Sequence, residues 1–272
     1  MCLIAIAWNT RPDLPLALIA NRDEFHARPT AGAAFDSQHP DVYGGRDLVQ
    51  GGSWLLASSR RRLAAVTNVR AGVAPEAAAL SRGWLVRDFV QGDASAADFA
   101  QSLSETAQDY GRFNLLVWDG AALWFASNHP RFDAAAVAPG LHAMSNGAFD
   151  APWPKSTAAT RTLADWLETM SPGALSESVD DAVLEPLFAG LRDTRTAPDA
   201  ALPDTGVGLE LERQLSPAFI EDPRYGTRCS SVALVDRHAV LLCERRFDAD
   251  GEAIDTSRQW LDARTLQRAR QA

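Results

Sequence analysis

Short apolar runs separated by turn-forming residues predict strands at both ends of the chain. The runs 3–8 and 16–20 flank the turn-rich segment 10–13, so we expect them to pair as a hairpin. Gly44-Gly45 and Gly51-Gly52 bracket a turn, and Asp119-Gly120 gives the strongest hairpin signal in the chain. The expected strands are 3–8, 16–20, 54–57, 63–67, 114–118, 122–126, 142–145, 230–236 and 239–245.

Between these strands the apolar residues recur every three or four positions, which is the period of a helix with one buried face. The expected helices are 79–90, 96–107, 156–170 and 180–191. Asp93 and Ser95 are candidate caps for the second of them. A loop rich in Pro, Asp and Gly is expected at 197–208, and a last strand or helix near 259–266.

Strands at both ends, with helices in blocks between them, predict an α+β fold of layered sheets and helices in which the two termini share a sheet. The chain shows no internal repeat and no linker that would divide it. We therefore expect a single domain over residues 1–272.

Composition and charge exclude several classes of function. The chain has 272 residues, 46% of them hydrophobic, and a net charge of −9. A nucleic-acid partner is excluded because phosphate binding needs a basic surface. No apolar stretch reaches the roughly 20 residues of a membrane-spanning helix, and the apolar start lacks the features of a signal peptide. We expect a soluble cytoplasmic protein.

The cysteines and histidines do not form a metal-binding pattern. The three cysteines, Cys2, Cys229 and Cys243, have no CxxC spacing, and the five histidines have no HxxxH pair. We therefore expect no disulfide framework, no metal site and no required cofactor.

Cys2 is the first candidate for chemistry. The thiolate is the reactive form of cysteine, and an α-amino group has a pKa close enough to that of a thiol to exchange a proton with it. Removal of Met1 would place both groups on one residue, as in enzymes that use an N-terminal nucleophile. The alternative is that Cys2 is a small buried residue at the start of a strand.

Asn21-Arg22-Asp23-Glu24 end the second expected strand with four consecutive polar residues. If that strand pairs with the first, its end lies in the same sheet as Cys2. Asp23 could then hold the amino group and the thiol in register, as the third member of a catalytic triad does. The alternative is an exposed loop in which Asn21 and Asp23 bond to their own backbone.

Asn68, Asn146 and Arg228 are further candidates for binding charge. An asparagine amide is a neutral donor suited to a developing oxyanion, and Arg228 could bind a carboxylate on a substrate or hold Asp23. The alternatives are ordinary turn residues for the two asparagines and a structural ion pair for Arg228.

The order of these motifs resembles the NRDE family of transport and Golgi organisation proteins, over residues 1–246. The motifs that support the resemblance are Met1-Cys2, 21–25 with Arg28-Pro29, 51–55, Thr67-Asn68, 81–83, 113–115, 141–146 with Pro152-Trp153-Pro154-Lys155, and Tyr225-Gly226-Thr227-Arg228.

That family is similar to the cysteine-type N-terminal nucleophile hydrolases, which implies an αββα sandwich of mostly antiparallel sheets. The resemblance matches Asp23 to their catalytic aspartate, and Asn68, Asn146 and Arg228 to their oxyanion asparagines and a later arginine. It departs from them at Ala20, where those hydrolases have an arginine. Arg22 would point to the opposite face of the strand from Asn21.

Two functions follow from the resemblance. The first is hydrolysis of a non-peptide C–N amide bond of a small acyl compound through an acyl-enzyme on Cys2. The second is non-enzymatic binding or trafficking of haem or an acyl-CoA-like lipid, with Cys2 as a ligand of the haem iron. The ligand-binding candidates are Asn21, Arg22, Trp54 and Trp153; tryptophans are also common core residues.

Overall fold

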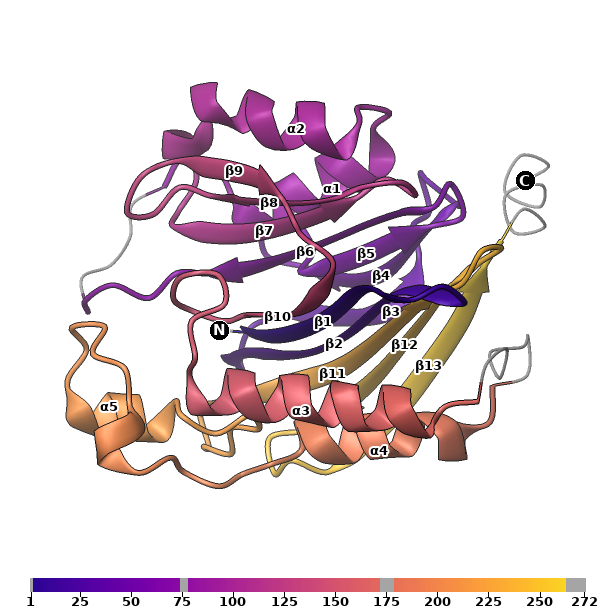
Figure 1. The fold of residues 1–272 in the computed structure, drawn as a ribbon. Coiled ribbons are helices and arrows are strands. Elements are labelled where there is room, and N and C mark those ends of the chain that lie inside the picture. The colour runs from indigo at the N-terminus through magenta and orange to yellow at the C-terminus, as the bar shows by residue number, and fades with distance from the viewer. Residues whose placement is uncertain (1, 74–77, 172–178, 263–272) are drawn as a thin grey trace.

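Two antiparallel sheets form the centre of the computed structural model, which describes residues 2–73, 78–171 and 179–262 (Figure 1). The first sheet has the order β10-β1-β2-β11-β12-β13 and the second the order β3-β4-β5-β6-β7-β8-β9. The strands are β1 (Cys2–Arg11), β2 (Leu14–Phe25), β3 (Thr30–Phe35), β4 (Val42–Asp47), β5 (Leu55–Ser58), β6 (Arg62–Asn68), β7 (Phe113–Trp118), β8 (Leu123–Ser127), β9 (Asp133–Ala136), β10 (Gly140–Met144), β11 (Tyr225–Val235), β12 (Val240–Phe247) and β13 (Ala253–Leu261).

Helices cover the outer face of each sheet (Figure 1). α1 (Arg82–Gln91) and α2 (Ala96–Ser102) pack on the second sheet, and α3 (Pro154–Thr169) and α4 (Asp181–Leu191) pack on the first. The short α5 (Leu209–Gln214) precedes β11, and single 3-10 turns occur at Leu103–Glu105, Ala107–Asp109 and Asp199–Ala201.

Strand alternation explains the layering, because successive side chains of a strand point to opposite faces. In β1, Ile4 and Ile6 enter the core between the two sheets, while Leu3 and Ala5 pack under α3 and α4. The layer order is therefore helix, sheet, sheet, helix. This is the αββα arrangement that the family resemblance implies, in the α+β fold that the order of strands and helices predicts.

The predicted strands all form, and the predicted hairpin 3–8 with 16–20 has Trp8 opposite Leu16 and Cys2 opposite Arg22. The two ends of the described chain share the first sheet, as expected. The first helix begins later than predicted, at Arg82, because the Ser81 side chain accepts a hydrogen bond from the backbone of Gly83 and caps it. The second ends at Ser102 and continues as two 3-10 turns.

The sequence pattern does not predict four of the observed elements: β3, β4, β9 and α5. The predicted turn between Gly44-Gly45 and Gly51-Gly52 forms at positions 48–50, and Gly44-Gly45 themselves lie inside β4. A Cβ at Gly45 would lie 2.1 Å from the Trp54 ring, so glycine is needed there for close packing and not for a turn. The last element is β13, and positions 263–266 of the predicted segment lie outside the described residues.

No helix within the described ranges is long and apolar enough to cross a membrane.

Candidate active site

Cys2 and Arg22 face each other across the β1–β2 pair, on the side that faces the second sheet. On that side Trp54, just before β5, packs in the core between the sheets. The Arg22 guanidinium lies over the Trp54 ring, 4.2 Å from its centroid. The sheet register therefore brings the thiol, the guanidinium and the indole to one end of the inter-sheet space.

These side chains open into a cavity of about 510 Å³. Its wall is mostly polar and contains three arginines, Arg22, Arg28 and Arg82. Cys2, Asp23, Glu24, Asp47, Asn68 and Tyr225 also line it. The cavity thus exposes one thiol to a small volume surrounded by charges of both signs.

The Cys2 sulfur accepts a hydrogen bond from the backbone N–H of Asp23. Burial raises the pKa of the Cys2 thiol; the charge of Asp23 raises this pKa further and that of Arg22 lowers it. Cys2 is partly exposed, whereas Cys229 and Cys243 are buried. Burial also raises the pKa of Cys243 to about 11 and that of Cys229 well above its usual value.

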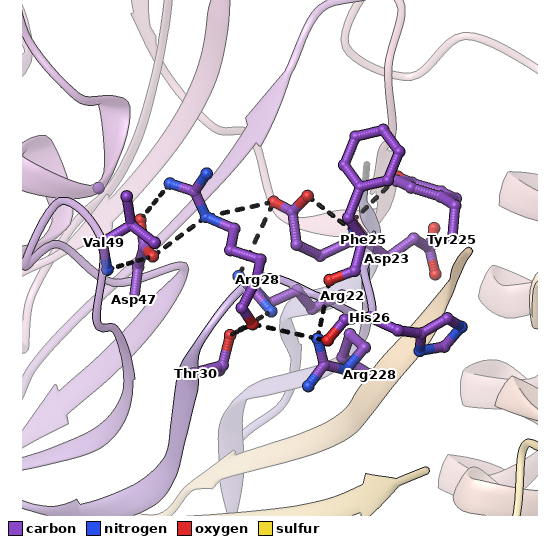
Figure 2. Close-up of polar contacts among 12 residues, drawn as sticks. Arg22, Asp23, Phe25, His26, Arg28, Thr30, Asp47, Val49, Tyr225 and Arg228 are labelled. Atoms are coloured by element: carbon purple, nitrogen blue, oxygen red, sulfur yellow. Dashed lines mark hydrogen bonds and ion pairs between the residues drawn. The ribbon is translucent and has the colours of Figure 1, made fainter. Parts of the chain in front are cut away.

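Asp23 is held from two sides by β11. Its Oδ1 accepts a hydrogen bond of 2.7 Å from Thr227 Oγ1. Its backbone carbonyl accepts one of 3.0 Å from the Tyr225 hydroxyl (Figure 2). Only 1% of Asp23 is exposed. Burial raises the pKa of this carboxyl, and the charge of Lys155 opposes that rise.

Lys155 is a buried cation close enough to act on both Cys2 and Asp23. It lies in the first turn of α3, and its Nζ donates a hydrogen bond of 2.9 Å to the carbonyl of Leu215. Burial lowers the pKa of Lys155 to about 8, and the charges of Asp23 and Cys2 act in the opposite direction. A cation near a helix N-terminus is unfavourable to the helix dipole, so this lysine is placed for contacts outside its helix.

Asn68 lines the cavity at the end of β6, and Asn146 lies directly behind it. Asn146 is fully buried, and its Nδ2 donates to the Oδ1 and the backbone carbonyl of Asn68, at 2.9 and 3.0 Å. Because the Asn68 oxygen accepts this bond, the Nδ2 end of its amide is the end left to donate. Asn146 thus orients Asn68.

Arg228 and Asn21 lie outside the cavity wall. Arg228 Nη1 donates to the backbone carbonyls of Phe25, His26 and Arg28, at 2.9, 3.2 and 3.3 Å, and so holds the segment after β2 (Figure 2). Asn21 points to the helix side of the sheet, where its Nδ2 donates to two backbone carbonyls, of Leu191 at 2.8 Å and of Ala218 at 2.7 Å. Both side chains therefore support the fold around the cavity.

Trp153 also lies away from the cavity wall. The Arg70 guanidinium lies over its ring, 5.3 Å from the ring centroid. A Cβ at Gly147 would lie 2.5 Å from the same ring. Of the four predicted ligand-binding residues, the structure places Arg22 and Trp54 at the cavity.

Sequence reasoning assigned no role to Lys155, Thr227 or Tyr225. All three lie inside motifs that support the family resemblance, so the motifs were the available signal. Arg28 was also unassigned; it donates to both carboxylate oxygens of Asp47, at 3.1 and 2.6 Å, and forms one side of the cavity (Figure 2). Within the described part of the chain, no three His, Cys, Asp or Glu side chains converge to hold a metal ion.

A family model and individual relatives place the chain in the same protein family. The family model for Transport and Golgi organisation 2 matches residues 1–249. The Transport and Golgi organization protein 2 homolog of Bos taurus is 31% identical, over 96% of this chain and 94% of its own length. The homolog of Homo sapiens is 29% identical over the same shares.

Two solved structures share a distant likeness. An N-acylethanolamine-hydrolyzing acid amidase ortholog of Caenorhabditis elegans has a TM-score of 0.48 at 8% identity, over 85% of this chain and 92% of that one. A mutant conjugated bile acid hydrolase of Clostridium perfringens has a TM-score of 0.44 at 8% identity, over 96% of this chain and 92% of that one.

Proposed function

The chain belongs to the Transport and Golgi organisation 2 family, and we propose that it hydrolyses a C–N amide bond of a small acyl compound through an acyl-enzyme on Cys2. The observation that supports this most is the position of Cys2. Its thiol lies in the wall of a polar cavity, bonded to the backbone of Asp23, with the Asp23 carboxyl and Lys155 buried close by.

The first step is attack of the Cys2 sulfur on the amide carbonyl carbon. After removal of Met1, the α-amino group of Cys2 takes the thiol proton, and Asp23 holds the resulting ammonium. The carbonyl oxygen gains a negative charge, to which Asn68 Nδ2 donates; Asn146 keeps that amide in place. The C–N bond then breaks, the ammonium returns its proton to the leaving amine, and a thioester remains on Cys2.

The second step is hydrolysis of the thioester. The α-amino group takes a proton from water as the hydroxyl oxygen attacks the thioester carbon, and the acid leaves as the thiol is reprotonated. The cavity volume of about 510 Å³ is in the usual range for a small-molecule site. Its polar wall favours a small polar substrate over an extended apolar one.

A labelling experiment tests this proposal. We would measure the intact mass for the presence of Met1, treat the protein with an activated acyl ester, and map the acyl group. Acylation at Cys2 without Met1, lost in Cys2→Ala and kept in Cys243→Ala, supports the mechanism. Retention of Met1, or acylation spread evenly over Cys2, Cys229 and Cys243, contradicts it.

Binding of haem or an acyl-CoA-like ligand without turnover is the second proposal. It is favoured by the three arginines in the cavity wall, whose guanidiniums suit carboxylate or phosphate groups. A hemin titration tests the haem form: a new absorbance band that disappears in Cys2→Ala supports iron ligation by Cys2. An unchanged band in that variant excludes Cys2 as the ligand.

A further inference from the structure

Arg22 is a nearly buried cation whose donors face the cavity. Its side chain is 7% exposed. The described residues give its guanidinium two polar contacts, and both are long: 3.4 Å from Nη1 to Thr30 Oγ1 and 3.9 Å from Nη2 to Glu24 Oε2. Charge-assisted hydrogen bonds are usually about 2.8 Å long. Most of the hydrogen-bonding capacity of Arg22 is therefore unused by these partners.

Arg62 shows what a fully partnered arginine looks like in this fold. As a whole residue Arg62 is 7% exposed, against 6% for Arg22 on the same whole-residue scale. Its guanidinium lies 4.0 Å from the centroid of the Phe89 ring. Arg62 donates to the carbonyls of Phe89 and Ala94 at 2.9 and 2.7 Å. Arg22 has nearly the same burial and also stacks on an aromatic ring. Its donors, however, face the cavity, whereas those of Arg62 bond to backbone carbonyls.

Glu24 does not fill the place of a close anionic partner. Its Oε1 accepts a hydrogen bond of 2.9 Å from the backbone N–H of Phe25. Its Oε2 is shared at similar distances between Arg22 and Arg28, 3.9 and 3.8 Å away. Arg28 in turn is committed to Asp47, as Figure 2 shows. The unfilled donors thus belong mainly to Arg22.

We propose that Arg22 binds a carboxylate of the substrate that lies a few bonds from the carbonyl attacked by Cys2. This inference rests on the proposed function of Cys2. Cys2 and Arg22 are direct cross-strand partners, whose Cβ atoms are roughly 5 Å apart in such pairs. The planar guanidinium can hold both oxygens of a carboxylate while Trp54 supports its face. The substrate class is then a small amide that carries an anionic group beside the scissile bond.

Two alkylating reagents test the inference without any turnover. Iodoacetate and iodoacetamide have nearly the same shape, and in each the Cys2 sulfur displaces iodide from carbon. They differ in the carboxylate that only iodoacetate carries. We would measure the alkylation rate of Cys2 with each reagent by mass mapping. The ratio compared is the rate with iodoacetate divided by the rate with iodoacetamide. In the wild-type protein, we expect the ratio at Cys2 to be about tenfold higher when folded than when unfolded in urea.

Arg22→Leu should lower the ratio in the folded protein by about tenfold. This substitution also raises the pKa of Cys2, but that change slows both reagents alike and leaves the ratio unaffected. Arg245→Leu is the matched control, because Arg245 lies 4.2 Å over the Phe188 ring and outside the cavity wall. It should leave the ratio unchanged.

A ratio that is equal in folded and unfolded wild-type protein overturns the inference, even if Arg22→Leu fails to fold. A ratio unchanged by Arg22→Leu in folded protein also overturns it. These outcomes are separate from failure of the proposed hydrolysis, which would show as absent acylation at Cys2. If the protein hydrolyses neutral amides and Cys2 shows no preference for iodoacetate, the proposed hydrolysis stands and carboxylate binding by Arg22 is excluded.

Discussion

Asp23 and Lys155 are charged residues near the partly exposed thiol of Cys2, in positions where burial is costly for charge. The sequence singles out Cys2, Asp23 and Asn68 as candidates because they lie at or near the ends of strands, in recognisable motifs. It does not identify Lys155 or Thr227, since their roles depend on α3 and β11 meeting β2 in space. The family motifs that contain Lys155 and Thr227 mark the two positions, but a lysine after Pro154 and a threonine inside a strand do not show which residues they contact.

Asp23→Asn should separate thiol reactivity from acyl transfer. The charge of Asp23 raises the pKa of Cys2, so its removal lowers that pKa and speeds alkylation by iodoacetamide at pH 7. Acyl transfer should fall by roughly 100-fold or more, because the amino group loses its orienting carboxylate. Alkylation and acylation rates at Cys2 check this, with Asp98→Asn, at an exposed position of α2, as the control. A parallel fall of both rates would mean that Asp23 acts only through the fold.

Lys155 should make stability depend on pH in alkaline solution. Its pKa is about 8 in the folded protein, against 10.5 as the ordinary value. Between these values the unfolded chain holds more protons, so the free energy of unfolding rises with pH, by about 3 kcal/mol in total. Below pH 8, Lys155 is protonated in the folded and in the unfolded protein, so the free energy of unfolding is lowered by the full cost of burying its charge.

Urea unfolding at pH 7.5, 9 and 10.5 measures this effect as the difference between wild type and Lys155→Met. The variant should lack the alkaline gain, because methionine does not titrate. Parallel pH profiles for the two proteins would contradict a depressed pKa for Lys155.

At the scale of elements, the sequence predicts strands that are continuous apolar runs and helices whose apolar residues recur every three or four positions. β1, β2, β7 and β8 are such apolar runs. β3 and β9 consist mainly of alanine and glycine at exposed or half-buried positions, and Thr30 is their one β-branched residue, so neither has a run of large apolar residues. They form strands because the neighbouring strands supply backbone partners, a long-range effect that no local window contains.

The approach of α1 to the segment before β5 places one rim of the cavity. A Cβ at Gly52 would lie 2.6 Å from the Cα and the carbonyl carbon of Gly83, so the two backbones pack in direct contact. Gly52→Ala should therefore displace the start of α1 and lower the free energy of unfolding by roughly 1–3 kcal/mol. Urea unfolding measures the loss, with exposed Gln38→Ala as the control. An unchanged free energy would show that this contact is easily relaxed.

At the scale of the whole molecule, one core joins the two sheets. Ile6 and Leu18 of the first sheet pack in the same buried cluster as Leu63 and Leu116 of the second. Neither sheet can keep its inner face buried without the other. This shared core is the physical reason to expect the single domain that the sequence predicts.

We therefore expect one cooperative unfolding transition. Tryptophan fluorescence and far-UV circular dichroism should give the same urea midpoint, because the tryptophans and both sheets lose their environment together. Two separate midpoints would divide the chain into independently stable units and contradict the single-domain prediction.

The order of strands in the first sheet also determines when the surroundings of Cys2 can form during biosynthesis. Cys2 leaves the ribosome first, yet the Tyr225 and Thr227 contacts that position Asp23 come from β11, more than 200 residues later. Until that strand has been made, the nascent chain carries a solvated thiol without its assembled surroundings. The removal of Met1 that the proposed mechanism requires can therefore take place before the cavity exists, because the cavity is assembled only when synthesis is nearly complete.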